Sequence, residues 1–214
     1  MEHMRGRAIT KFDLFKAAVR VERDLLHENV GIQDQVHAAF GGLNLYCFHK
    51  DEFSIRPVQM HTANRDALNE SLCLVFTGVQ RHASATLEKQ LDNTREKKIH
   101  KELSHLIALC EQGLALLESA NAERMLTDFG KLLREGWETK RKLSSAVTLP
   151  EIDSIYDEAM RLGAYGGKLC GAGGGGFLLF MAAPHVQDKI RETFGAKNFV
   201  KIALEDAGAQ IIVR

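Results

Sequence analysis

Glycine is concentrated in one short segment of this 214-residue chain, and that segment constrains the fold more than any other feature. Eight of the eighteen glycines fall between Gly163 and Gly176, overlapping the run GGKLCGAGGGGFLLF at residues 166–180. Glycine loses more backbone entropy on folding than any other residue, so the cluster needs a structural reason. Only three prolines interrupt the whole chain, which predicts long regular elements around one glycine-rich turn.

Two interpretations of this turn are open. Successive bare N–H groups form a concavity that binds anions, and glycines with positive φ would expose such groups. Alternatively, the glycines form a tight corner where another part of the protein packs closely against the main chain. The segment has neither the G-x-x-x-x-G-K-[ST] order of a phosphate-binding loop nor the βαβ context of a dinucleotide fingerprint.

A second informative segment is Gly-Ile-Gln-Asp-Gln at residues 31–35. Asp34 lies between two amides just before an apolar stretch, which is a suitable setting for a general base. Glu22, twelve residues earlier on a predicted helix, would supply a carboxylate oxygen of the kind that Mg²⁺ prefers. The alternative for Asp34 is a structural role as a helix cap or turn residue.

The first half of the chain predicts a helix over residues 12–28, and Thr10 with Asp13 has the spacing of a capping box. Two helical turns are expected within residues 31–42. Three strands follow in the prediction, at residues 44–48, 54–60 and 72–76, the first two joined as a hairpin.

The second half predicts long amphipathic helices over residues 83–143, broken near Asn121. Pro150 begins a helix that Gly163 ends, and a further helix is expected near residues 186–194. The apolar face of the first long helix is predicted to comprise Leu103, Leu106, Ile107, Cys110, Leu114 and Leu117. Strands are expected at residues 177–181, 199–204 and 210–213. This order indicates an α+β sandwich with helices on one face of a sheet.

Composition excludes several function classes. With 28 Lys and Arg against 28 Asp and Glu, the chain has no excess charge for binding nucleic acid or an acidic membrane. No apolar run approaches the ~20 residues of a membrane span, and the first ten residues lack the apolar core of a signal peptide. The four cysteines are scattered and flanked by apolar residues, so we expect buried free thiols in a cytoplasmic protein.

The two informative segments together resemble the GHMP kinase superfamily, and within it the sugar kinases that act on D-glycero-D-manno-heptose 7-phosphate. GGKLCGAGGGGFLLF is similar to the third motif of that family, and GIQDQVHAAFGGLNLYCF to the stretch that contains its catalytic aspartate. The resemblance also includes LVFTGVQRHAS at residues 74–84 and KRKLSSAVTLPEIDSIYDEAM at residues 140–160. It implies an incomplete N-terminal kinase domain at residues 1–66 and a ferredoxin-like C-terminal domain at residues 67–214.

The resemblance also implies roles for individual residues. Asp34 matches the aspartate that orients or deprotonates the attacking sugar hydroxyl, and Glu22 the acidic residue near the magnesium ion. The residues implied to lie beside the ATP phosphates are Gly171, Ala172, Gly173, Gly174 and Gly175. Those assigned to the sugar phosphate substrate are Gly31, Gln33, Gln35, Gly41, Gly42, Arg81 and Lys168. An arginine would hold a phosphate bidentately and a lysine as a point charge, although Arg81 and Lys168 could equally form surface ion pairs.

Members of this family carry a further block, with a P-x-x-x-G-L-G-S-S-S-A loop that wraps the ATP phosphates, before the region that matches here. No Gly-Ser-Ser run occurs in this chain, which resembles the C-terminal two-thirds of a kinase. We therefore expect weak ATP binding by the chain alone, with a second copy or an N-terminal fragment covering an open sheet edge. The expected function is ATP-dependent phosphorylation of a heptose phosphate. A fucose- or galactose-type kinase and a non-catalytic interaction module are the alternatives.

Overall fold

The computed structural model describes residues 9–49, 52–79, 94, 99–144 and 146–210. The chain divides into two compact units, which we call unit 1 (residues 1–57 and 204–214) and unit 2 (residues 58–203). Unit 1 therefore consists of two separate stretches of chain. The domain boundary that the sequence suggests at residue 66 stays a prediction.

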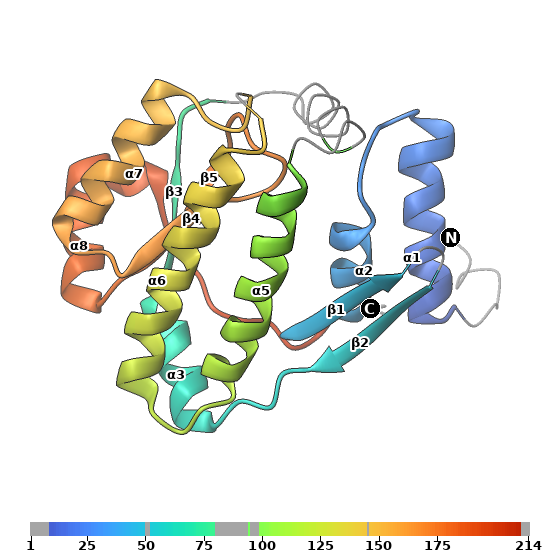
Figure 1. The fold of residues 1–214 in the computed structure, drawn as a ribbon, viewed down its shortest axis with the longest axis horizontal. Coiled ribbons are helices and arrows are strands. Elements are labelled where there is room, and N and C mark those ends of the chain that lie inside the picture. Colours follow the sequence, from blue (N-terminus) through green and yellow to red (C-terminus); the bar gives the residue numbers. More distant parts are fainter. Residues whose placement is uncertain (1–8, 50–51, 80–93, 95–98, 145, 211–214) are drawn as a thin grey trace, which may run out of the picture. The chain divides into compact units, whose positions relative to one another are not determined.

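The elements of unit 1 are two helices and a hairpin (Figure 1). Their bounds are α1 Lys11–Arg20, continued by a π-helical turn at Val21–Leu25, then α2 Gln33–Phe40, β1 Asn44–His49 and β2 Glu52–Pro57. The predicted capping box is confirmed, because the Thr10 hydroxyl accepts from the Asp13 N–H and the Asp13 carboxylate accepts from the Thr10 N–H. The predicted first helix ends earlier than residue 28, at the π-helical turn.

The hairpin is antiparallel, and Phe48 pairs with Phe53 beside its turn. The second strand begins two residues earlier and ends three residues earlier than the sequence predicts. Phe15, Val36 and Ala39 form the buried core of unit 1, and Phe53 packs edge-on against Phe15 with 5.2 Å between ring centroids. Because these are the only buried hydrophobic side chains among the described residues of unit 1, this core is small.

The chain returns to unit 1 after residue 203. The Ala209 N–H donates to the Ala38 carbonyl oxygen at 2.9 Å, and the Gly42 N–H donates to the Glu205 carbonyl oxygen at 3.1 Å. Gly41, with φ of 69°, lies so close that a Cβ atom there would be 2.1 Å from the Gly208 nitrogen. This close backbone contact joins the last described residues to the end of α2.

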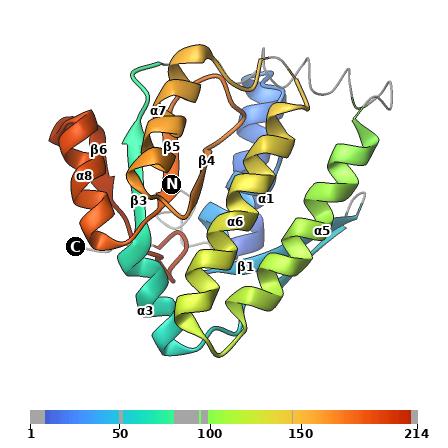
Figure 2. The same cartoon turned by 60° about the vertical axis from the view of Figure 1, so that its left-hand side comes forward.

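Unit 2 is built from five α-helices and four strands in its described residues (Figure 2). In chain order they are α3 Thr62–Ser71, β3 Leu72–Phe76, α5 His100–Leu117, α6 Ala122–Arg141, α7 Pro150–Leu162, β4 Gly166–Leu169, β5 Phe177–Met181, α8 Pro184–Phe194 and β6 Phe199–Lys201, with a 3₁₀ turn at Ala196–Asn198 before β6.

The strand order in the sheet is β4-β5-β3-β6, and every neighbouring pair is antiparallel. Together with the helices between β3 and β4 and between β5 and β6, this is the ferredoxin-like α+β arrangement that the resemblance implies. The strand predicted to run to residue 204 ends at Lys201. Gln210 is not in a strand, and residues 211–213 of the last predicted strand lie outside the described residues.

One face of the sheet carries the main core. Val75 and Phe180 on the strands are fully buried against Trp137 of α6, Ile152 of α7 and Ile190 of α8. Alternate strand residues share this face because successive side chains point to opposite sides of a strand. The prediction of helices packed on one sheet face is therefore confirmed by this cluster.

The predicted apolar face of α5 is wrong in part. Ile107 is 63% exposed and Cys110 is also exposed, whereas Leu109, Gly113 and Leu117 are the buried positions. Gly113 is buried because α6 packs close to it, and a Cβ atom there would be 3.2 Å from the Phe129 ring. The packed face is thus rotated toward a small residue that hydrophobicity alone does not mark.

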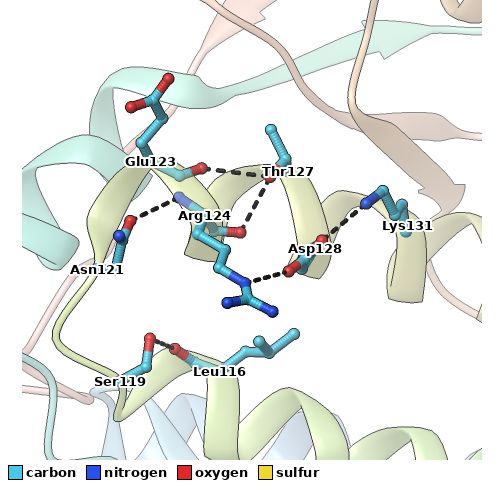
Figure 3. A network of polar contacts seen from close by, with 8 residues as sticks. All are labelled: Leu116, Ser119, Asn121, Glu123, Arg124, Thr127, Asp128 and Lys131. Carbon is cyan, nitrogen blue, oxygen red and sulfur yellow. Dashed lines mark hydrogen bonds and ion pairs between the residues drawn. The ribbon is translucent and has the colours of Figure 1, made fainter.

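Near Asn121, where the sequence predicts a break, helix α6 begins (Figure 3). The Asn121 side-chain oxygen accepts from the Arg124 N–H at 2.9 Å and caps α6, while the Ser119 hydroxyl donates to the Leu116 carbonyl oxygen at the end of α5. Further along α6, Asp128 accepts from Arg124 and Lys131 of the same helix. No helix in the described residues is long and apolar enough to cross a membrane.

Candidate functional site

The glycine-rich turn of unit 2 connects β4 to β5 over residues 170–176. All five of its glycines have positive φ, which other residues rarely adopt, namely Gly171 at 67°, Gly173 at 113°, Gly174 at 78°, Gly175 at 159° and Gly176 at 95°. The Cys170 N–H donates to the Phe177 carbonyl oxygen at 2.9 Å and closes the base of the turn. The positive-φ explanation of the glycine cluster therefore holds for this part of it.

Neighbouring segments fix the turn from both sides. On one side, the Gly176 carbonyl oxygen accepts from the N–H and the hydroxyl of Thr77, each at 2.9 Å. On the other side, the Gly174 N–H donates to the Val147 carbonyl oxygen at 2.9 Å. Lys140, in the last turn of α6, donates from its Nζ to the Gly171 carbonyl oxygen at 2.6 Å. The turn is consequently held by hydrogen bonds from three neighbouring segments.

Four main-chain N–H groups of the turn have no acceptor within the described part of the chain. They belong to Gly171, Ala172, Gly173 and Gly175. Apart from the adjoining residues, no atom of the described chain lies within 4 Å of where a Cβ would stand on Gly171 or Gly176, so the described structure leaves the space beside them open. Successive unpaired N–H groups in a rigid turn suit a phosphate, because each contributes a fixed partial positive charge.

The first glycines of the cluster serve packing instead. A Cβ atom on Gly166 would be 1.8 Å from the Gly130 carbonyl oxygen, and one on Gly167 would be 2.5 Å from the Phe180 ring. Bare backbone at these positions lets α6 lie directly against β4. Close packing therefore accounts for Gly166 and Gly167 and positive φ for the glycines of residues 171–176, while anion binding by the turn stays a prediction.

Two lysines lie near the base of the turn. Burial raises the pKa of the Cys170 thiol, and the positive charges of Lys168 and Lys140 partly oppose that rise. Lys168, which is predicted to bind the substrate phosphate, lies on β4 and is half-buried. Arg81, its predicted partner, lies outside the described residues. Lys140 was not predicted, because a lysine in the last turn of a helix is an ordinary dipole partner in sequence.

In unit 1, Asp34 lies in the first turn of α2 and is exposed. The N-cap of this helix is Ile32, so Asp34 is not the cap. Its carboxylate makes no hydrogen bond or ion pair with any other described residue, and the helix N-terminus favours negative charge there. An exposed, unpaired carboxylate fixed on a helix is able to accept a proton from a substrate hydroxyl.

Glu22 belongs to the π-helical turn after α1 and is half-buried. The Gln35 side-chain NH₂ donates to its carboxylate, while the Gln35 carbonyl oxygen is buried without a partner. No cluster of three or more metal-ligating side chains occurs among the described residues. Mg²⁺ at phosphate sites needs only one or two carboxylates in addition to the phosphates, so Glu22 fits that mode of binding.

The other predicted substrate residues of unit 1 differ in their surroundings. Gly31 and Gln33 are exposed at the start of α2. Gly41 and Gly42 have positive φ and lie against residues 205–208, so packing within unit 1 already accounts for both glycines. The substrate assignments of all these residues stay predictions.

Comparison with known proteins agrees with the fold and with the motifs. Residues 115–200 match the family model described as "GHMP kinases C terminal". The D-glycero-alpha-D-manno-heptose 7-phosphate kinase of Campylobacter jejuni is 30% identical over 180 residues, which are 81% of this chain and 50% of that protein.

Two solved structures show the same fold at lower identity. Mevalonate kinase of L. major has a TM-score of 0.69 and 20% identity, and the match covers 93% of this chain and 60% of that one. A D-glycero-D-manno-heptose 1-phosphate kinase from Bacteriodes thetaiotaomicron has a TM-score of 0.60 and 22% identity, with 98% and 58% covered. The chain thus spans between half and three-fifths of the length of these relatives. Residues 115–200 are therefore similar to the C-terminal region of the GHMP kinases, and the chain carries part of the α+β fold of that family.

Proposed function

We propose that this chain takes part in transferring the γ-phosphate of ATP to a hydroxyl of a phosphorylated heptose. The observation that carries the proposal is the glycine turn, in which the N–H groups of Gly171, Ala172, Gly173 and Gly175 have no acceptor among the described residues. The similarity to a heptose 7-phosphate kinase supports the choice of acceptor.

In this proposal the glycine turn binds the phosphate chain of ATP. Phosphoryl transfer passes through a loose transition state with charge spread over the phosphate oxygens, so fixed N–H donors are what the reaction needs. Lys140, which donates to the Gly171 carbonyl oxygen, adds positive charge at the turn. Mg²⁺, when bound, would neutralise charge on the phosphates, with Glu22 as the carboxylate that holds it.

Asp34 is assigned the role of base. The sugar hydroxyl transfers its proton to the Asp34 carboxylate as its oxygen forms a bond to the γ-phosphorus. The bond between that phosphorus and the bridging oxygen breaks, and the electron pair leaves with ADP. Lys168, with Arg81, is proposed to hold the phosphate that the heptose already carries.

The first experiment is nucleotide binding by the 214-residue chain. Titration calorimetry is expected to show weak ADP binding and no binding of adenosine, because the proposed contacts are to phosphate. Charge-assisted hydrogen bonds are each worth roughly 1.5–3 kcal/mol, so a site with the glycine turn alone falls well short of a complete kinase. Equal binding of adenosine and ADP would contradict the assignment of the turn.

The second experiment measures turnover by ADP release in the chain co-expressed with the half of the Campylobacter jejuni relative that it does not match. Asp34→Ala is expected to lower turnover by about 10²–10⁴-fold without weakening ADP binding. Asp188→Ala, an exposed carboxylate on α8, is the matched control and should have no effect. Unchanged turnover in Asp34→Ala would remove the base role.

The acceptor is tested by comparing heptose 7-phosphate with free fucose, galactose and heptose. Preference for the phosphorylated sugar, lost on Lys168→Met, supports a second phosphate site. Preference for a free sugar supports a fucose- or galactose-type kinase, and ADP binding without turnover on any sugar supports an interaction module.

A further inference from the structure

The middle of the glycine turn packs against Val147, in the segment before α7. Val147 is fully buried, and its carbonyl oxygen accepts from the Gly174 N–H at 2.9 Å. A Cβ atom on Gly173 would be 2.8 Å from that oxygen and 3.0 Å from the Val147 Cα. Any shift of Val147 would therefore move the turn, and with it the unpaired N–H groups of Gly173 and Gly175.

The position of Val147 is in turn fixed by a carboxylate. Asp153, in the first turn of α7, accepts from the hydroxyl of Thr148 at 2.7 Å through Oδ1. Its Oδ2 accepts from the Arg141 guanidinium at 2.9 Å. Thr148 is the residue next to Val147, and Arg141 is the last residue of α6. One partly buried carboxylate thus joins the end of α6 to the segment that supports the glycine turn.

We propose that Asp153 is a positioning residue for phosphate binding, acting on the glycine turn through Thr148 and Val147. Asp153 touches no reacting atom, and its effect is to hold in place the turn that carries these N–H groups. The identity of that anion as the phosphate chain of ATP rests on the proposed function above. The structural step, from Asp153 to the turn, does not depend on it.

Removing a carboxylate that pairs with two side chains can by itself lower stability, so a control must separate that loss from an effect on the glycine turn. Asp128 provides it (Figure 3). Like Asp153, Asp128 pairs with two side chains, Arg124 at 3.3 Å and Lys131 at 2.8 Å, and has a similar exposure of 27% against 24%. Both of its partners lie on α6, so it joins no other segment to that helix.

The test compares Asp153→Ala with Asp128→Ala in the ligand-free 214-residue chain by amide hydrogen exchange. In Asp153→Ala, the Gly174 amide, which donates to the Val147 carbonyl oxygen, is expected to exchange about tenfold faster, the change produced by losing one hydrogen bond. The amides of Leu178 and Phe180 in β5 should keep their rates. A general loss of stability would instead accelerate both regions.

ADP titration of the same variants is the second measurement. Asp153→Ala is expected to weaken ADP binding by about tenfold, whereas Asp128→Ala leaves it unchanged. Thr148→Val removes only the hydroxyl and preserves the Asp153–Arg141 pair, so it should shift both measurements in the same direction by a smaller factor. If Asp153→Ala does not fold, the hydrogen exchange and ADP titration of Thr148→Val alone test the positioning role.

Exchange in residues 171–176 that matches wild type in Asp153→Ala and Thr148→Val would overturn the proposal. Absence of ADP binding in the wild-type chain would instead remove the proposed ligand, and the exchange measurement would still decide the positioning role.

Discussion

The two units differ in how completely they bury their hydrophobic side chains. In unit 2, Trp137, Phe180 and Ile152 are at most 1% exposed, in a core shared by the sheet and three helices. In unit 1, Leu25 and Leu26 at the end of the first helix are 62% and 63% exposed. Most of the large hydrophobic side chains that are exposed in the described chain belong to unit 1: Ile9, Phe12, Leu14, Val21, Leu25, Leu26 and Phe48.

The two groups of candidate site residues therefore lie on parts of the molecule that differ in how well their cores are packed. The glycine turn connects two strands of a well-packed sheet, whereas Asp34 lies on an eight-residue helix over a small core. Because small cores contribute little stability, local interactions such as caps matter more in unit 1. The following predictions test this contrast.

The largest expected effect is in the core of unit 2. Phe180→Ala should destabilise that unit by about 3–5 kcal/mol, because it leaves a cavity among fully buried neighbours. Phe15→Ala in unit 1 should cost less, since Phe12 and Phe53 beside it are partly exposed and can close the gap. The single tryptophan, Trp137, reports on unit 2 in urea denaturation.

Only Phe180→Ala is expected to move the midpoint of the Trp137 transition. Equal shifts from both variants would show that the two units unfold together and that the contrast is wrong.

Alkaline pH should weaken unit 2 by a smaller amount. Burial raises the pKa of Cys73 to about 12, so the folded state keeps a proton that the unfolded thiol loses near pH 9. The unfolded state then binds fewer protons, and stability falls by about 1.4 kcal/mol per pH unit as pH rises from about 9 toward 12. Tyr156, whose pKa burial also raises to about 12, adds to the fall above pH 10.

Urea titrations followed by circular dichroism at pH 8, 9 and 10 measure this slope. Cys73→Ala should flatten it, whereas Cys110→Ala, which removes an exposed thiol on α5, should leave it unchanged. The same slope in both variants would contradict the assignment to Cys73.

The smallest effect is at a helix cap. Thr10→Ala removes the capping box of α1 and should cost about 1 kcal/mol, as should Asn121→Ala at the start of α6. In unit 1 this loss should open α1 locally, so its amides exchange faster while β5 stays protected. In unit 2, Asn121→Ala should leave local exchange in the middle of α6 nearly unchanged. Similar local opening in both helices would remove the contrast.

Elements with strong start and stop signals could be predicted from the sequence. Pro150 begins α7, Gly163 ends it with φ of 111°, and β3 and β5 have the predicted bounds. Helix α3 was not predicted, because its buried positions include Asn64 and Ser71 and it has no side-chain cap. Ser71 is accommodated by donating its hydroxyl to the Leu68 carbonyl oxygen at 2.8 Å, which no hydrophobic pattern shows.

Some residues of the candidate site could also be identified from the sequence, and others could not. The glycine turn and Asp34 stand out because their residue types are unusual at those places. Strand β4 was not predicted, since Gly166 and Gly167 are poor strand residues, and only the approach of Gly130 to the first and of Phe180 to the second explains them. Lys140 and Asp153 act through tertiary contacts, which neither composition nor periodicity reveals.

The return of the chain to unit 1 has a consequence for how the protein can be shortened. Because Ala209 and Glu205 bond to the segment at the end of α2, the chain's last described residues complete its first folded part. Unit 2 is an insertion within unit 1, entered after Pro57 and left before Leu204. A cut at residue 203 would therefore leave the sheet of unit 2 whole and remove support from the helix that carries Asp34, far away in sequence.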